Sequence, residues 1–210
     1  DPRELDPVHA GEHADAAVRK ASTSRPTTDG RRGHPELRPW PPVEPAAQAP
    51  GAFSGACDRE LAATLARQVL ERLRTAERPV ILAGGALRTA GAYEAFLRLV
   101  DRLGVPVCTA WNAADLLWDD HPLFAGRPGS IGQRGGNFAL QNADVVLLMG
   151  ARLNWILHFG LPPRFNPDVR VIQMDIAAEE IGTNVSAEVA LVGDAKAVTG
   201  QLNAVLREQP

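Results

Sequence analysis

Three apolar, strand-like segments in the second half of the chain each end in glycine or aspartate, and this pattern constrains the fold most. Strands are expected at 144–149, 169–175 and 189–192, and Gly150, Asp175 and Asp194 mark their carboxyl ends. In an open parallel sheet these ends meet at one edge, where loops and helix amino termini present unpaired N–H groups to nucleotides. The pattern therefore predicts a nucleotide-binding module.

Two earlier strands and several amphipathic helices complete the expected sheet. Apolar runs at 79–83 and 105–109 predict buried strands. Apolar residues at helical spacing predict three helices. The first starts at Asp58, the second is stopped by Gly104, and the third follows the last strand. The apolar residues are Leu61, Leu65, Val69 and Leu73, then Tyr93, Phe96, Leu97, Val100 and Leu103, and finally Ala195, Val198, Leu202 and Val205. Strands alternating with helices predict an α/β fold with a doubly covered parallel sheet and right-handed crossovers.

The first quarter of the chain has a different character. Seven prolines fall between Ser22 and Pro50 among few large apolar residues, so this stretch cannot bury enough surface to offset its ordering entropy. A chain of 210 residues suits one domain and a tail. We expect a proline-rich extended segment over 1–57 and one domain over 58–210.

Composition excludes several classes of function. The 22 basic and 25 acidic residues give a net charge of -3, which offers no electrostatic case for nucleic acid or a membrane surface. No apolar run approaches the roughly 20 residues of a membrane span, and the amino terminus has no signal-peptide core, so a cytoplasmic location is expected. Cys57 and Cys108 lack metal-ligand spacing and are expected to be free thiols.

The glycine pair after the first strand is the expected position of a phosphate-binding turn. Gly84 and Gly85 are followed by alanine rather than by the Gly-x-Gly-x-x-Gly spacing, and the second strand ends at Cys108-Thr109 without an acid for a ribose. An ordinary NAD site is therefore disfavoured. The alternative for the glycines is a turn required only by tight strand-to-helix packing.

Arg152, Asp175 and Asp194 are the polar candidates at successive strand ends. The Asp175 carboxylate is suited to accept both hydroxyls of a ribose, whereas its alternative role is to cap the segment that begins at Ala177. The Arg152 guanidinium is suited either to stack on an adenine or to fork onto phosphate. Three such residues at neighbouring strand ends favour a binding site.

No catalytic or metal centre can be assembled from the sequence. His121 lies in a polar loop, where a solvated or hydrogen-bonded imidazole is expected, and His158 lies among apolar residues, where packing is the more common role. Neither a Ser-His-Asp nor a Cys-His arrangement is indicated.

Several segments of the chain resemble a known family. Segments 78–85, 120–123, 142–147 and 150–194 resemble the central domain of thiamine-diphosphate-dependent enzymes of the acetolactate synthase group. Within the group, 151–165 is most similar to 2-hydroxyacyl-CoA lyase, with oxalyl-CoA decarboxylase next. The resemblance covers roughly 58–206 and implies a Rossmann-like, three-layer domain with a six-stranded parallel sheet.

The resemblance also implies a ligand. In acetolactate synthases this domain holds FAD, which is not used for redox chemistry, and in the acyl-CoA enzymes the same face holds ADP or the nucleotide of coenzyme A. By position, Gly84 and Gly85 would approach the phosphates, and Arg152 would contact the adenosine portion.

The same resemblance assigns residues to the adenosine end of the ligand. Asp175 and Ile176 would hold the ribose and adenine, and Asp194 with Ala195 would border the adenine. This assignment agrees with the strand-end pattern.

The chemistry of this family requires residues that this sequence does not contain. A glutamate on an amino-terminal domain activates the thiazolium, and a motif on a carboxyl-terminal domain binds magnesium and the diphosphate. Only 16 residues follow Asp194, so the chain is expected to be inactive alone and to act with amino- and carboxyl-terminal thiamine-diphosphate domains, as part of a homo-oligomer. The alternative is a ligand-free scaffold that acts through protein contacts, which Ala86 favours because its methyl group would crowd a diphosphate.

Overall fold

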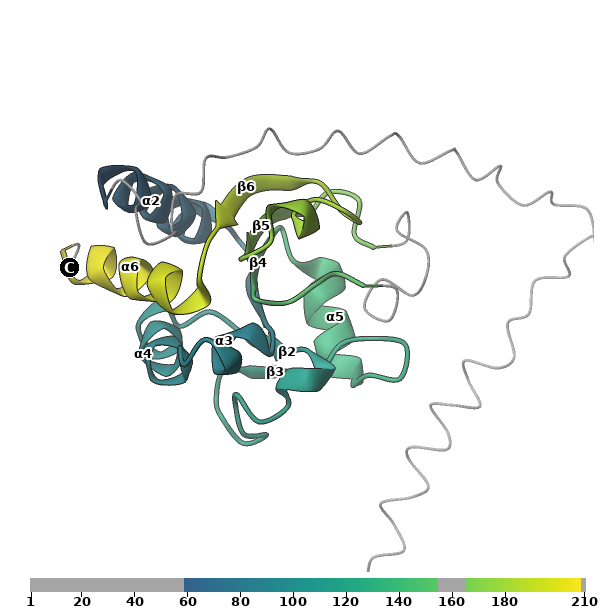
Figure 1. Cartoon of the computed structure of the whole chain (residues 1–210). Coiled ribbons are helices and arrows are strands. Elements are labelled where there is room, and N and C mark those ends of the chain that lie inside the picture. Colours follow the sequence, from purple (N-terminus) through teal and green to yellow (C-terminus); the bar gives the residue numbers. More distant parts are fainter. Residues whose placement is uncertain (1–58, 155–164, 209–210) are drawn as a thin grey trace, which may run out of the picture. The chain divides into compact units, whose positions relative to one another are not determined.

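The computed structural model describes residues 59–154 and 165–208. The proline-rich segment, the expected boundary at residues 57 and 58, Cys57 and His158 lie outside these ranges. Within them, the chain forms one α/β domain around a single sheet (Figure 1).

The sheet has six strands, all of them parallel. Their order is β3-β2-β1-β4-β5-β6, in which both halves of the chain run outward from the adjacent strands β1 and β4. The strands are β1 (Pro79–Ala83), β2 (Val107–Thr109), β3 (Phe124–Gly126), β4 (Val145–Met149), β5 (Arg170–Asp175) and β6 (Ala187–Val192). This arrangement confirms the predicted three-layer fold. It also leaves a crevice outside the carboxyl ends of β1 and β4, where the strand order reverses.

Helices cover both faces of the sheet. In Figure 1, α2, α4 and α6 lie on one side of it, whereas α5 lies on the other. The helices are α2 (Arg59–Thr75), α3 (Ala86–Thr89), α4 (Tyr93–Leu103), α5 (Arg134–Asn142) and α6 (Ala195–Glu208), with short 3-10 helices η1 (Trp111–Ala113) and η3 (Ala178–Glu180). Gly104 ends α4 in the left-handed conformation, with φ of 62°, as its position after an apolar stripe predicts.

Two apolar cores fill the spaces between the layers. Successive side chains of a strand point to opposite faces, so Ile81 and Leu147 join the core under α2, α4 and α6, whereas Leu82 and Leu148 join the core on the α5 side. Strands β1 and β4 are buried on both faces. This explains why β1 and β4 read as uninterrupted apolar runs rather than as alternating ones.

Besides short helical turns, the structure adds a strand, β3, and a longer helix, α5, to the elements predicted from the residue pattern. Strand β3 has three residues, two of them only partly buried, so it lacks the apolar run that marks a strand. Helix α5 starts with Arg134-Gly135-Gly136 and has no side-chain cap, so the usual signals of a helix start are missing.

The first helical stripe is slightly displaced from its predicted position. In α2 the fully buried side chains centre on Ala62, Ala66 and Leu70 together with the predicted Val69 and Leu73, whereas Leu61 and Leu65 are only partly buried. The pattern gave no weight to small alanines, although Ala62 and Ala66 are buried in the core.

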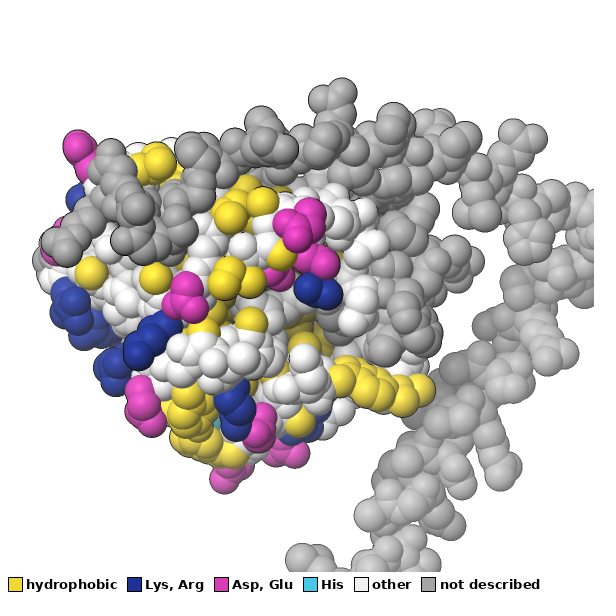
Figure 2. Space-filling model, viewed as in Figure 1, with side chains coloured by type: hydrophobic (Ala, Val, Ile, Leu, Met, Phe, Trp, Pro, Cys, Tyr) yellow, Lys and Arg dark blue, Asp and Glu magenta, His cyan; other side chains and the backbone are white. Residues whose placement is uncertain are grey.

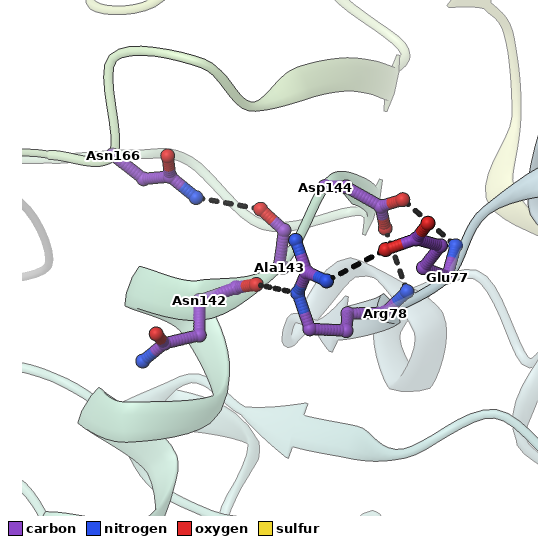
Figure 3. A network of polar contacts seen from close by, with 6 residues as sticks. All are labelled: Glu77, Arg78, Asn142, Ala143, Asp144 and Asn166. Carbon is purple, nitrogen blue, oxygen red and sulfur yellow. Dashed lines mark hydrogen bonds and ion pairs between the residues drawn. The ribbon is translucent and has the colours of Figure 1, made fainter.

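A polar network joins the amino ends of β1, β4 and β5. The Asp144 carboxylate accepts hydrogen bonds from the backbone N–H groups of Glu77 at 2.8 Å and Arg78 at 2.9 Å (Figure 3). The Asp144 carbonyl oxygen accepts the N–H of Arg170 at 3.0 Å. Asn166 donates to the Ala143 carbonyl oxygen at 2.6 Å. These contacts fix where three neighbouring strands begin.

The network also sets the ionisation of Asp144. Partial burial acts to raise its pKa, but the hydrogen bonds from the two backbone N–H groups and the charge of Arg78 together lower the pKa below its ordinary value of 3.8. The carboxylate is therefore charged at neutral pH and serves as a fixed acceptor.

Candidate functional site

A tight contact between two loops shapes the crevice at the carboxyl ends of β1 and β4. A Cβ atom built on Gly84 would lie 2.0 Å from the carbonyl oxygen of Gly150, and one built on Gly150 would lie 2.6 Å from the Cβ of Ala86. Gly150 also has a φ of 61°, which favours glycine. Close packing alone therefore accounts for Gly84, as the alternative explanation in the sequence proposed.

A cavity of about 720 Å³ opens beside this contact. It runs across the carboxyl ends of β2, β1, β4 and β5. Its lining comprises Gly85, Ala86, Arg88, Thr89, Ala110, Trp111, Asn112, Gly150, Ala151, Arg152, Asn154, Asp175 and Ile176. Four of the predicted site residues, Gly85, Arg152, Asp175 and Ile176, thus share one cavity.

A second, smaller cavity of about 220 Å³ adjoins the first. The two share Asp175 and Ile176, and Asp194 and Ala195 line the smaller one. Of the predicted site residues, only Gly84 lines neither cavity. The side chains expected around an adenosine therefore lie along one edge of the sheet rather than on different sides of the domain.

Arg152 forms one wall of the large cavity. Its Nη2 atom lies 3.1 Å from Oε1 of Glu180, and its side chain is 60% exposed. The guanidinium therefore keeps most of its surface available to a ligand while one of its nitrogens pairs with an acid on η3.

Asp175 has the capping role considered for it in the sequence, and it also lines the crevice. Its Oδ1 atom accepts the backbone N–H of Ala177 at 3.0 Å, which starts the turn into η3. Within the described residues, its Oδ2 atom has no hydrogen-bond partner, and the residue lines both cavities. The carboxylate thus caps a turn with one oxygen, and its other oxygen makes no hydrogen bond to the residues that the structure describes.

Asp194 is the amino-terminal cap of α6. Its Oδ1 atom accepts the backbone N–H groups of Lys196 at 2.9 Å and Ala197 at 3.0 Å. A cap of this kind satisfies donors that the first helical turn leaves unpaired. The residue is half-buried and lines the smaller cavity, next to the buried Ala195.

Ile176 offers an apolar surface beside these polar groups. Its side chain is 72% exposed, so most of its surface is accessible beside Arg152 and Asp175, which line the same cavity. Figure 2 shows hydrophobic surface between acidic and basic side chains on this view of the domain. An exposed aliphatic residue next to a carboxylate and an arginine suits a ligand with a flat base, a polyol and an anionic group.

Comparisons with known proteins identify the domain. The family model described as "Thiamine pyrophosphate enzyme, central domain" matches residues 66–202. The chain belongs to this family.

Three relatives show how far the similarity extends. Human 2-hydroxyacyl-CoA lyase 1 is 44% identical over 138 residues, which are 66% of this chain and 23% of that protein. A probable acetolactate synthase large subunit of Methanocaldococcus jannaschii is 38% identical over 67% of this chain and 24% of its own length. Sulfoacetaldehyde acetyltransferase of Roseovarius nubinhibens is 38% identical over 65% and 23%. The chain spans just under a quarter of each relative's length.

In this central domain, the loop after β2 forms one wall of the large cavity, and this wall was not predicted from the sequence. Trp111 is 43% exposed, and its Nε1 atom donates to the carbonyl oxygen of Pro128 at 3.2 Å. Asn112 lies next to Gly85, and Arg88 on α3 pairs with Asp115 at 2.5 Å. A signal was present for Trp111 and Asn112, because they lie just after a parallel strand, but an acid was the only signal considered at that strand end, and the strand has none.

Among the described residues of this central domain, the one histidine, His121, and the one cysteine, Cys108, make structural contacts. Nδ1 of His121 accepts the Leu123 N–H at 3.2 Å, and its ring packs edge-on against Trp118. Burial raises the pKa of the Cys108 thiol to about 12. In residues 59–154 and 165–208, no three His, Cys, Asp or Glu side chains are grouped to hold a metal ion, and no helix is long and apolar enough to cross a membrane.

Proposed function

We propose that this central domain binds the ADP portion of a nucleotide, as FAD, ADP or coenzyme A, within a thiamine-diphosphate-dependent lyase or carboligase. One observation carries the proposal: the cavity at the switch point of the sheet brings Gly85, Arg152, Asp175 and Ile176 together. In open α/β sheets this crevice is where ligands bind.

The dimensions and donors of the cavity support a nucleotide. Its volume of about 720 Å³ lies within the range of about 300–1,000 Å³ that is usual for small-molecule sites. The N–H of Gly85 makes no hydrogen bond within the described residues, and a side chain there would meet the amide of Asn112. A small residue with an unpaired donor is suited to the close approach of a phosphate.

The residues also suggest how the ligand would be oriented. The unpaired Oδ2 of Asp175 would accept ribose hydroxyls, and the exposed side chain of Ile176 would cover one face of the adenine. Asp194 and Ala195 would border the base in the smaller cavity. The phosphates would then extend toward Gly85 in the larger one.

The reaction itself would belong to the whole enzyme. The relatives are named as a lyase, a synthase and an acetyltransferase. Thiamine diphosphate, when bound with Mg²⁺, supplies the thiazolium that breaks or forms a carbon–carbon bond beside a carbonyl. We propose that amino- and carboxyl-terminal domains hold that cofactor and that the assembly is a cytoplasmic homo-oligomer. This domain would bind the nucleotide and support the assembly.

Calorimetric titration of the folded chain with ADP, coenzyme A and FAD tests the ligand. Saturable binding of one of them is expected, and Arg152→Ala is expected to weaken it roughly tenfold, because a charged contact to the ligand is lost. Thermal unfolding of the same variant serves as the control for fold. Failure of all three ligands to bind folded protein would overturn the proposal.

The scaffold alternative is supported by a specific observation. Gly84, Asp175 and Asp194 each have a structural role that needs no ligand: loop packing, turn capping and helix capping. Under that alternative, Arg152→Ala would change only stability. The titration therefore separates the two functions, since only a ligand site predicts a changed Kd.

A further inference from the structure

The ion pair between Arg152 and Glu180 has a specific place in the cavity wall. Arg152 follows β4 and lines the cavity, whereas Glu180 belongs to η3, follows β5 and does not line it. The two side chains thus connect the loops of neighbouring strands. Glu180, which is not part of the cavity lining, thus pairs with the Arg152 guanidinium, which is part of it.

The turn that carries Glu180 is rigidly held by β5. Gln173, only 4% exposed, donates from Nε2 to the Glu180 carbonyl oxygen at 3.0 Å and accepts the Gly182 N–H at 2.9 Å. The Glu180 N–H donates to the Ala177 carbonyl oxygen at 3.1 Å. Because Asp175 starts the same turn, one strand positions both the ribose acceptor and the partner of the arginine.

We propose that Glu180 is a positioning residue that holds the Arg152 guanidinium at the adenosine end of the cavity. The proposal rests on the nucleotide site proposed above. An exposed arginine has several rotatable bonds, and ordering it on binding weakens affinity, so a partner that orders it beforehand strengthens binding. Pairing through Nη2 leaves the flat face of the guanidinium for a base and restricts the range of positions that the group occupies.

The neighbouring Glu179 provides a matched control. It lies in the same 3-10 turn and carries the same charge, but within the described residues it forms no ion pair. Glu179→Gln and Glu180→Gln therefore alter the long-range field at the cavity in a similar way. Only Glu180→Gln removes the contact to Arg152.

The test measures the Kd for ADP of the full chain and its variants by calorimetry. Glu180→Gln is expected to weaken binding roughly two- to tenfold relative to Glu179→Gln, since the ordering of one long side chain is lost. With Arg152→Ala already present, Glu180→Gln is expected to have no further effect, because the two act through one contact.

Three outcomes overturn the inference. These are equal Kd values for Glu179→Gln and Glu180→Gln, tighter binding by Glu180→Gln than by Glu179→Gln, and independent, additive effects of Glu180→Gln and Arg152→Ala. If the wild-type chain binds ADP and one of these is seen, only the role of Glu180 fails, whereas absence of wild-type binding removes the nucleotide site as well. Should Glu180→Gln not fold, Glu180→Asp tests the same point, because it keeps the charge but shortens the side chain that reaches Arg152, and a Kd equal to that of Glu179→Asp would contradict the proposal.

Discussion

The carbonyl oxygen of Gly150 occupies the space that a side chain on Gly84 would need, since a Cβ atom there would lie 2.0 Å from it. The loops after β1 and β4 are therefore in backbone contact at the point where the strand order reverses. This contact forms the floor beside the cavity. A side chain at position 84 would therefore force these backbone segments apart.

Gly84→Ala is expected to destabilise the domain by about 3 kcal/mol or more, because backbone on both sides must shift. A Cβ atom on Gly85 would lie 2.9 Å from the end of the Asn112 side chain and 3.3 Å from the Asn112 carbonyl oxygen, so Gly85→Ala is expected to lose only about 1 kcal/mol or less, because the side chain can move away. Urea unfolding of both variants measures the difference. Equal losses would contradict the proposed contact between the loops.

Gly200→Ala is expected to stabilise the domain. Gly200 lies in the interior of α6, and a Cβ atom there would meet nothing within 4 Å. Glycine within a helix is less favourable than alanine by about 0.5–1 kcal/mol, so the substitution should raise the free energy of unfolding by that amount. A lower midpoint of thermal unfolding than wild type would refute this.

Substitutions of Asp194 separate its capping role from any contact with a ligand. Asp194→Ala should lower the free energy of unfolding by about 1 kcal/mol, because two N–H groups of α6 lose their acceptor. Asp194→Asn should lose only a few tenths of that, since asparagine caps well. The comparison needs denaturant unfolding of both variants at neutral pH, and the cap assignment fails if the alanine variant is as stable as wild type.

Asp144 should make a pH-dependent contribution to stability. Its pKa is lowered in the folded state, so its stabilising effect is present above the ordinary value of 3.8 and is lost as the pH falls through the folded value. Asp144→Asn is expected to lower the free energy of unfolding at pH 7 by about 1 kcal/mol, because one strong acceptor is replaced. The gap between the variant and wild type should narrow below about pH 4. A gap that is independent of pH would exclude the charged network.

The Cys108 thiol should be unreactive in the folded domain. With Cys57→Ser removing the other cysteine, a disulfide reagent at pH 8 should label Cys108 slowly in native protein and rapidly in urea, because burial raises its pKa to about 12. The same shift means that this residue's contribution to stability is lost as the pH rises above about 9. Rapid labelling of native protein would show that the core opens easily.

The sequence predicted the fold well where burial alone determines the residues. Strands β1, β4 and β5 are buried on both faces, so their apolar runs identify them directly. Strand β3 and helix α5 were missed because neither has such a signal: the strand is three residues long, and the helix begins with two glycines. Their positions depend on contacts with β2 that only the folded chain provides.

The candidate site was predictable in part for a related reason. Residues at the carboxyl ends of parallel strands must meet, so Arg152, Asp175 and Asp194 could be grouped from their positions in the chain. Trp111 also follows a strand, but its neighbourhood has no charged residue to draw attention to it. The pairing of Glu180 with Arg152 was not predicted, because it depends on the position of η3 relative to β5 in the folded chain.

The Asp144 contacts bind the amino ends of β1, β4 and β5, at the opposite edge of the sheet from the cavity. Strand alignment at these amino ends thus does not depend on the side chains that line the crevice. Apart from the tight contact between Gly84 and Gly150, those side chains are consequently free to diverge, so one ligand can replace another during evolution, or the crevice can close, while the framework stays intact. For protein engineers, this separation means that side chains at the carboxyl ends of the strands can be changed to select a new ligand, while the Asp144 network at the amino ends is left as it is.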